Sequence, residues 1–418
     1  MQIVPLEGGA PAEEVLRALG ARARRRDLPP PAALTGDWFG GSAVLAPSVP
    51  ISPDVDAPPD LDQVDAPPGA VGGGWIGYLG YGRTDPGRHP EPRVLPTAAW
   101  GWTDHVLRRD PAGRWWFESL TGADAALVSE LAELVRGGAE PAAPWTAGPV
   151  RAPDRERHGK AVRGCVAEIG AGEVFQANIC TRFEVPFEGD PVAVFAAGSA
   201  RFHPARAAYL AGGWGAVVSL SPELFLARHG RSVRTGPIKG TLPRRGPADD
   251  GNAERLRASV KDVAENVMIV DMARNDLGRV AEVGSVSVPA LLDVQPHPGV
   301  WHLVSDVVAE LPPGLPDSAL LAATFPPASV TGAPKVRALE LIAELEEHPR
   351  GVYCGAIGMV SPAAGLELNV AIRTLELAPD GVFHLGVGGG ITADSDADRE
   401  WQEVRTKAAP LLDLLSRS

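Results

Sequence analysis

Apolar residues recur at helical spacing in several long segments of the chain. Leu127, Leu131 and Leu134, for example, would lie on one face of a helix with 3.6 residues per turn. Another such segment begins near residue 155 and stops at the small residues 170–172, which favour the end of a helix. The pattern predicts helices at residues 123–136, 155–169, 250–275, 333–347 and 396–415.

Shorter apolar segments predict strands between these helices. Residues 72–81 alternate glycine with aromatic and aliphatic side chains, as in a strand that another backbone approaches closely. Strands and helices come in clusters rather than in strict alternation, which favours an α+β fold over a doubly wound parallel sheet. The other predicted strands are at residues 180–186, 208–210, 216–219, 355–360 and 366–377.

The chain contains one segment with the composition of a linker. Residues 137–153 consist largely of glycine, alanine and proline. We place the main boundary there, between an N-terminal part at residues 1–145 and a larger region at residues 150–415.

The overall composition excludes several classes of protein. At 44% hydrophobic and 22% charged residues, the chain is ordinary for a globular protein. A net charge of −13 without a basic block argues against binding to nucleic acid or anionic membranes. No apolar run is long enough to span a membrane, and the N-terminus lacks the pattern of a secretory signal. Three scattered cysteines fit a reducing cytoplasm better than a disulfide framework.

Lysine is rare in this chain, with five lysines among 39 basic residues. Arginine serves solubility and ion pairing about as well, but only lysine offers an amine that can lose its proton and act as a nucleophile. The retained lysines are therefore candidates for chemistry, and Lys239, in the sequence Pro-Ile-Lys-Gly-Thr, is the most informative. Three others lie in motif-like segments: Lys261, Lys335 and Lys407.

Two pairs of carboxylates suggest a metal site. Asp262 and Glu265 are three residues apart on one predicted helix, and Glu400 and Glu403 are three apart on another. Each pair therefore shares a helix face. Two such faces brought together would form an oxygen-rich site suited to Mg²⁺. A single pair of this kind is more often a solvated surface feature, but the apolar run at 267–270 beside Glu265 favours the metal site.

Further segments could bind an anion or transfer a proton. The glycine-rich residues 386–391 offer bare backbone N–H groups to a carboxylate or phosphate, or form a plain tight turn. Arg373, within a predicted apolar strand, needs an anionic partner, which is either a ligand or a structural ion pair. Burial of Glu223 between strands would raise its pKa and suit it to act as a general acid. His302 alone would be taken for an ordinary core residue.

These segments, in this order, resemble the chorismate-utilising enzymes, which include anthranilate, aminodeoxychorismate, isochorismate and salicylate synthases. The resemblance covers nearly all of residues 155–410, and residues 72–82 are similar to the family's N-terminal portion. It implies large antiparallel β-sheets packed as a sandwich, with helices on the outside. The matching stretches are residues 172–183, 221–225, 236–241, 261–280, 302–305, 329–342, 353–361, 372–377 and 386–407.

The resemblance also implies which residues form the active site. Glu265 and Glu403 would bind Mg²⁺, which would hold the ring carboxylate of chorismate. Asp262 and Glu400 would support these ligands, and Glu223 would protonate the departing C4 hydroxyl. The other expected site residues are the catalytic Lys239, Thr241 and His302 and the substrate-binding Gln176, Thr331, Tyr353, Arg373, Gly388, Gly389, Gly390 and Lys407.

Two positions distinguish the branches of the family. Members that add water use a lysine base where this chain has Gln176, which disfavours isochorismate and salicylate synthases. Anthranilate synthases typically have alanine at the position of Lys239, whereas the lysine is similar to the aminodeoxychorismate-forming branch. In that branch the amine attacks ring C2 and ammonia then adds at C4, so that one hard substitution becomes two easier ones. An anthranilate synthase and a non-catalytic chorismate-binding subunit are the alternatives.

The source of nitrogen is expected to lie outside this chain. The sequence has no Gly-x-Cys-x-Gly nucleophile region of a glutamine amidotransferase. The resemblance therefore implies that a separate glutamine amidotransferase subunit supplies ammonia, or that free ammonia is used.

Overall fold

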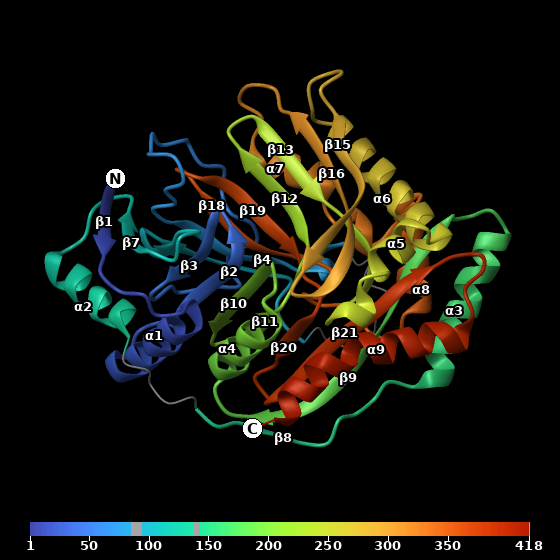
Figure 1. Ribbon diagram of the computed structural model, residues 1–418, viewed down its shortest axis with the longest axis horizontal. Coiled ribbons are helices and arrows are strands. Elements are labelled where there is room, and N and C mark those ends of the chain that lie inside the picture. The colour runs from blue at the N-terminus through green and yellow to red at the C-terminus, as the bar shows by residue number, and fades with distance from the viewer. Residues whose placement is uncertain (85–93, 138–142, 418) are drawn as a thin grey trace.

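Two large antiparallel sheets form the framework of the protein (Figure 1). The computed structural model describes residues 1–84, 94–137 and 143–417. In this part of the chain the first sheet has twelve strands, in the order β1-β7-β6-β3-β2-β10-β11-β20-β21-β9-β17, with β8 paired to β9. These strands are β1 (Gln2–Leu6), β2 (Ala32–Trp38), β3 (Gly41–Ala46), β6 (His105–Arg109), β7 (Trp115–Ser119), β8 (Thr146–Ala147), β9 (Gln176–Glu188), β10 (Arg206–Gly212), β11 (Gly215–Ser219), β17 (Gly332–Ala333), β20 (Thr374–Leu377) and β21 (Val382–Ile391).

The second sheet has nine strands in the described residues. Their order is β14-β16-β13-β12-β19-β18-β4-β5, with β15 paired to β16. The strands are β4 (Gly74–Leu79), β5 (Ala98–Thr103), β12 (Leu224–His229), β13 (Ser232–Gly236), β14 (Ile238–Arg244), β15 (Ser287–His297), β16 (Gly299–Glu310), β18 (Ala356–Ser361) and β19 (Gly365–Val370).

A hydrophobic core lies between the two sheets. Leu34 and Val217 of the first sheet and Ile76 and Tyr78 of the second belong to one buried cluster. Helices cover the outer faces, so the expected α+β sandwich with external helices is confirmed. Across the described residues, every helix is too short or too polar to traverse a lipid bilayer. The α-helices are α1 (Ala12–Arg26), α2 (Ala125–Arg136), α3 (Arg155–Gly170), α4 (Pro191–Phe202), α5 (Asn252–Arg257), α6 (Val260–Gly278), α7 (Asp317–Thr324), α8 (Lys335–Leu345) and α9 (Ala397–Ser416).

The two predicted parts of the chain contribute strands to both sheets. Strand β2 pairs with β10 in the first sheet, and β4 pairs with β18 in the second. In both pairs, one strand precedes the predicted linker and the other follows it. The N-terminal part therefore extends the same framework that carries the larger region.

Two predicted elements are each divided in the structure. The helix predicted at 250–275 is α5 and α6, because the Ser259 hydroxyl accepts a hydrogen bond from the N–H of Asp262 and so caps the start of α6. The strand predicted at 366–377 is β19 and β20, which belong to different sheets. The chain crosses between them at 371–373, where Arg373 adopts a φ of 50°. Arg373 is thus in a crossover and not within a strand.

Candidate active site

The site is centred where the chain passes from one sheet to the other. Glu223 lies in the link from β11 to β12, and Arg373 lies in the return link from β19 to β20. The N–H of Leu220 donates to the carbonyl of Arg373 at 3.0 Å, and the N–H of Val370 donates to that of Glu223 at 3.0 Å. These two hydrogen bonds hold an acid and a guanidinium on neighbouring crossovers.

Glu223 has the properties expected of a proton donor. Its side chain is 3% exposed, and the N–H of Ile238 donates to its Oε1 at 3.4 Å. Burial raises the pKa of Glu223 from 4.5 to about 7, because the ionised carboxylate loses most of its hydration. A substantial fraction of this carboxyl is therefore protonated near neutral pH and available to act as a general acid.

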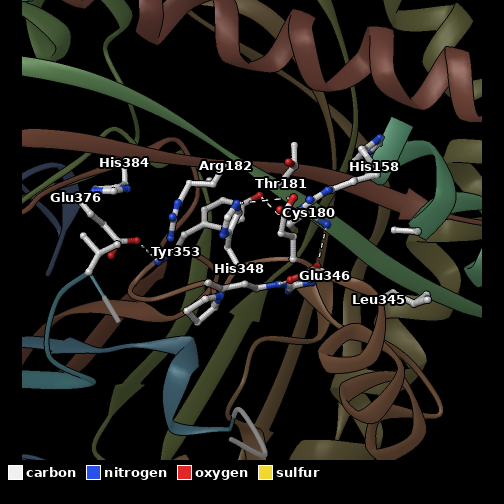
Figure 2. A pocket seen from close by; sticks show the side chains of 17 residues that line it. His158, Cys180, Thr181, Arg182, Leu345, Glu346, His348, Tyr353, Glu376 and His384 are labelled. Atoms are coloured by element: carbon white, nitrogen blue, oxygen red, sulfur yellow. Dashed lines mark hydrogen bonds and ion pairs between the residues drawn. The ribbon is translucent and has the colours of Figure 1, made fainter. Parts of the chain in front are cut away.

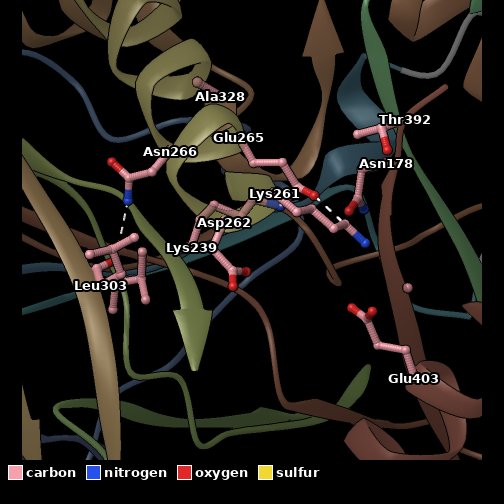
Figure 3. A network of polar contacts seen from close by, with 12 residues as sticks. Asn178, Lys239, Lys261, Asp262, Glu265, Asn266, Leu303, Ala328, Thr392 and Glu403 are labelled. Atoms are coloured by element: carbon pink, nitrogen blue, oxygen red, sulfur yellow. Dashed lines mark hydrogen bonds and ion pairs between the residues drawn. The ribbon is translucent and has the colours of Figure 1, made fainter. Parts of the chain in front are cut away.

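A β-bulge directs Lys239 away from its strand. Where β14 pairs with β16, the pairs Ile238–Val304 and Thr241–His302 enclose two residues on β14 and one on β16. The second of these two residues, Gly240, has a φ of 88°, which a residue with a side chain rarely adopts. The bulge places Lys239 Nζ 3.7 Å from Glu265 Oε2, on helix α6 (Figure 3).

His302 is held as a neutral ring beside this bulge. Its Nδ1 lies 2.8 Å from the Thr241 hydroxyl oxygen, and its ring packs edge-on against His297. Burial, together with the positive charge of Arg373 and the neighbouring His297, lowers the pKa of His302 to about 3. His302 can therefore exchange hydrogen bonds at neutral pH, but it does not supply a proton as an imidazolium.

Both acidic helices reach the glycine-rich strand β21. A methyl group on Gly389 would lie 3.2 Å from Glu403 Oε1 and 3.3 Å from Glu400 Oε2, both on α9. A methyl group on Gly390 would lie 3.1 Å from Glu265 Oε2, on α6. The fold thus brings carboxylates from two distant helices onto adjacent glycines.

Ammonium groups balance these carboxylates. Lys407 Nζ is 2.7 Å from Glu403 Oε1 and donates to the carbonyl of Gly388 at 2.9 Å. Burial raises the pKa of Glu265. Burial also acts to raise the pKa of Glu403, but the positive charges of Lys407, Lys261 and Lys239 together outweigh it, and the pKa of Glu403 is lowered. Within the described ranges, no three His, Cys, Asp or Glu side chains are grouped to hold a metal by themselves.

The glycine run at 386–391 is part of a strand and not a tight turn. It pairs with β9, where Gly388 lies opposite Cys180 and Gly390 opposite Asn178. Antiparallel pairing uses the N–H groups of alternate residues only. On its other edge, β21 pairs with β20 only as far as Leu385, and no described strand continues that pairing. The remaining N–H groups of the run face an edge that a carboxylate could approach.

The other predicted contacts lie around this strand. Gln176 packs on Gly390, where a methyl group would be 2.1 Å from its Nε2. Thr331 is buried and donates its hydroxyl to the carbonyl of Ala328 at 3.0 Å. Arg373 is solvent-exposed, and no described hydrogen bond or ion pair involves its guanidinium, whose charge acts on Glu223 and His302 at longer range. Arg373 is therefore available to an anionic ligand.

Tyr353 lies at the far end of the glycine run. Its ring would contact a methyl group on Gly386 at 2.3 Å, and its hydroxyl is 3.8 Å from Cys180 Sγ. Figure 2 shows Tyr353 lining a polar cleft together with His158, Arg182 and His384. No described contact joins Tyr353 to Arg373, so the structure does not bring these two predicted carboxylate-binding residues into direct contact.

The sequence did not single out two buried residues that position the site. The hydroxyl of Ser305 on β16 donates to Asn266 Oδ1 at 2.6 Å, and Asn266 Nδ2 donates to the carbonyl of Leu303 at 3.2 Å. These bonds fix α6, and with it Glu265, against the strand that carries His302. In the sequence, the only indication of this role is that Asn266 follows Glu265 and that Ser305 lies three residues after His302.

Lys335 has a structural role instead of a chemical one. Its Nζ is 2.5 Å from Asp276 Oδ2 and also donates to the carbonyls of Thr324 and Pro326. The rarity of lysine therefore identifies positions that need an ammonium group, but not all of them are catalytic.

Comparison with known proteins assigns this architecture to a family. The family model described as "chorismate binding enzyme" matches residues 53–413. The chain belongs to the chorismate binding enzyme family.

Individual relatives carry two kinds of name. Aminodeoxychorismate synthase component 1 from Escherichia coli is 43% identical over 63% of this chain and 58% of its own length. The protein of the same name from Klebsiella aerogenes is 39% identical over 81% of this chain and 76% of its own length. Anthranilate synthase component 1 from Streptomyces coelicolor is 36% identical over 83% of this chain and 73% of its own length. The matched part thus spans a little over half of the first of these relatives.

Solved structures share the fold. Anthranilate synthase component I from Streptococcus pneumoniae superposes with a TM-score of 0.73 at 29% identity, over 84% of this chain and 83% of its own. The menaquinone-specific isochorismate synthase from Escherichia coli superposes with a TM-score of 0.74 at 21% identity, over 99% of this chain and 94% of its own. The β-sandwich fold is therefore shared by an anthranilate synthase and an isochorismate synthase.

Replacing Glu223 by glutamine should make stability less dependent on pH. In the wild type, the carboxyl is protonated in both folded and unfolded states at low pH, and its raised native pKa disfavours folding as pH rises past 4.5 and through about 7. We expect the free energy of unfolding of Glu223→Gln, relative to wild type, to rise by about 3 kcal/mol between about pH 4.5 and pH 8.5. Urea unfolding of both proteins at these two pH values measures the free energies of unfolding. If Glu223→Gln and wild type differ in stability by the same amount at both pH values, the raised pKa is contradicted.

Proposed function

We propose that this protein is the chorismate-aminating large subunit of an aminodeoxychorismate synthase. It would convert chorismate and ammonia to 4-amino-4-deoxychorismate without releasing pyruvate. The observation that carries the proposal is the placement of Lys239 on a glycine-dependent bulge that faces Glu265. The adjacent residue, Ile238, donates its N–H to the protonatable Glu223, so a nucleophile and a proton donor are linked through one residue.

The proposed reaction has two displacements. The Lys239 amine bonds to ring C2, the two conjugated ring double bonds both shift, from C1=C2 and C5=C6 to C1=C6 and C4=C5, and the C4–O bond breaks as Glu223 gives its proton to the leaving hydroxyl. Ammonia then bonds to C4, both double bonds shift back to C1=C2 and C5=C6, and the C2–N bond to Lys239 breaks. The proton that ammonia loses can return to Glu223, which restores the enzyme. His302 and Thr331 would flank the ring, with His302 held by its hydrogen bond to the catalytic Thr241.

Substrate binding would use the cationic and amide groups around β21. Arg373, Lys407 and the outward N–H groups near Gly388, Gly389 and Gly390 are suited to the enolpyruvyl carboxylate. Tyr353, Gln176 and Thr331 would complete the binding surface. The exposed and unpaired guanidinium of Arg373 is the strongest support, because a structural ion pair would already have occupied it.

The carboxylates of α6 and α9 fit a Mg²⁺ cofactor. Glu265 and Glu403 would be its ligands, with Asp262 and Glu400 behind them, and the ion would neutralise the carboxylates facing a dicarboxylate substrate. The donor set is entirely oxygen, as Mg²⁺ prefers. Mg²⁺ commonly takes only one or two protein carboxylates and completes its shell with water and substrate.

Anthranilate synthesis is the competing function. Relatives of both names match this chain at similar identity. We favour amination at C4 because Lys239 replaces the alanine expected of anthranilate synthases, while Gln176 disfavours the enzymes that add water. A subunit that only binds chorismate would need neither Lys239 nor Glu223.

We further propose a cytoplasmic enzyme that works with a glutamine amidotransferase partner. The name "component 1" that its relatives bear supports a two-component system, and three free cysteines agree with a reducing compartment. The product would feed para-aminobenzoate and folate synthesis or a secondary metabolite.

Lys239→Ala should abolish covalent capture of the substrate. With chorismate and Mg²⁺ but no ammonia, we expect intact-mass spectrometry to detect an adduct on the wild type and none on Lys239→Ala. With ammonia present, C4 amination should fall by at least about 100-fold, because the covalent route is lost. Lys239→Arg should be no better, because a guanidinium stays protonated. Amination by Lys239→Ala at near wild-type rate would refute the covalent mechanism.

The purified chain should depend on free ammonia. We expect turnover with ammonium salts, increasing as pH rises and more ammonia is unprotonated, and no turnover with glutamine alone. Addition of a glutamine amidotransferase partner should make glutamine effective. Glutamine-dependent activity of the chain by itself would disprove the proposed division of labour.

A further inference from the structure

Lys261 is the lysine of this site to which the proposed reaction gives no role. It lies in the first turn of α6 with a half-exposed side chain. Its Nζ is 3.8 Å from Glu265 Oε1, one turn further along the same helix (Figure 3). The same Nζ is 3.6 Å from Glu400 Oε1 on α9. Lys261 therefore connects the carboxylates of two helices that are far apart in the sequence.

The two neighbouring lysines do not make this connection. Within ion-pair distance, Lys239 contacts Glu265 and Lys407 contacts Glu403 among the described residues, so each of these lysines contacts a carboxylate of one helix only. The charge of Lys239 also acts on Glu403, but at longer range. Glu400 has one further donor, the hydroxyl of Ser395 at 2.7 Å, which carries no charge. Of these three lysines, Lys261 is thus the one whose described ion pairs reach carboxylates of both α6 and α9.

These carboxylates need a counter-ion. Glu265 and Glu400 are only 7% and 4% exposed, so water screens their mutual repulsion poorly. An ammonium group between them offsets this repulsion in the metal-free protein. A divalent cation placed between the same oxygens would meet Lys261 as a like charge.

We propose that Lys261 is a tethered counter-ion that holds the carboxylates of α6 and α9 together before metal binding and competes with the divalent cation for them. This inference rests on the metal site of the proposed function. The flexible four-carbon stem allows the ammonium group to move out into solvent when the cation binds, and its half-exposed position leaves room for that movement. Competition from Lys261 would then lower the affinity of the substrate-free enzyme for Mg²⁺.

The direct test is titration of the purified protein with MgCl₂ by calorimetry, at fixed ionic strength and without substrate. Lys261→Met removes the charge and keeps the length of the stem, and we expect it to bind Mg²⁺ about tenfold more tightly than wild type. Lys261→Arg keeps the charge and should bind as weakly as wild type. Lys160→Met is the matched control, because Lys160 is exposed on α3 and has no described contact with the carboxylates.

Thermal unfolding distinguishes competition from a merely structural contact. Without metal, Lys261→Met should unfold at a lower temperature than wild type, and Mg²⁺ should raise its midpoint by more than it raises that of wild type. Equal Mg²⁺ affinity in wild type and Lys261→Met would overturn the inference and leave the metal site intact. If Mg²⁺ binds to none of the variants, with or without chorismate, the metal site itself is overturned.

Discussion

The close approach of side chains to the backbone of β21 is the constraint on which the site depends. A methyl group on Gly386 would overlap the ring of Tyr353, one on Gly388 would meet the backbone of β9 at 2.4 Å, and one on Gly390 would overlap Gln176. At Gly389 the same space is taken by the carboxylates of α9. Because these positions lack side chains, one strand can serve as the floor of the site and as the meeting point of two acidic helices.

A buried ion pair stabilises β9, the strand that pairs with β21. Arg350 and Glu346 form an ion pair whose side chains are each 2% exposed, and Arg350 also donates to the carbonyls of Asn178 and Val330. Glu346 in turn accepts the N–H of Cys180. Breaking such a pair leaves an uncompensated buried charge, so it fixes the position of β9. The ion pairs of Lys239 and Lys261 with Glu265, by contrast, are longer, at 3.7 and 3.8 Å.

The sequence predicts those features that depend on local pattern. The helical periodicity at 123–136 and 396–415 places α2 and α9 to within two residues, and the spacing of the acidic pairs predicts which carboxylates share a face. Contacts between residues that are far apart in the sequence cannot be predicted from local periodicity. The apolar run at 366–377 gives no sign that the chain changes sheets at Arg373. Helix α1 is not among the predicted helices, although its sequence carries an apolar face that includes the buried Val15, Leu16 and Leu19. Nor does spacing show that Lys261 contacts Glu400.

Identification of the product tests the central claim most directly. Purified protein would be incubated with chorismate, MgCl₂ and ¹⁵N-labelled ammonium at raised pH, and the products separated and analysed by mass spectrometry and ¹⁵N NMR, with a parallel assay for pyruvate. We predict 4-amino-4-deoxychorismate, with nitrogen on C4, the enolpyruvyl group retained and no stoichiometric pyruvate. Anthranilate formed together with pyruvate, or isochorismate without nitrogen, would contradict the assignment.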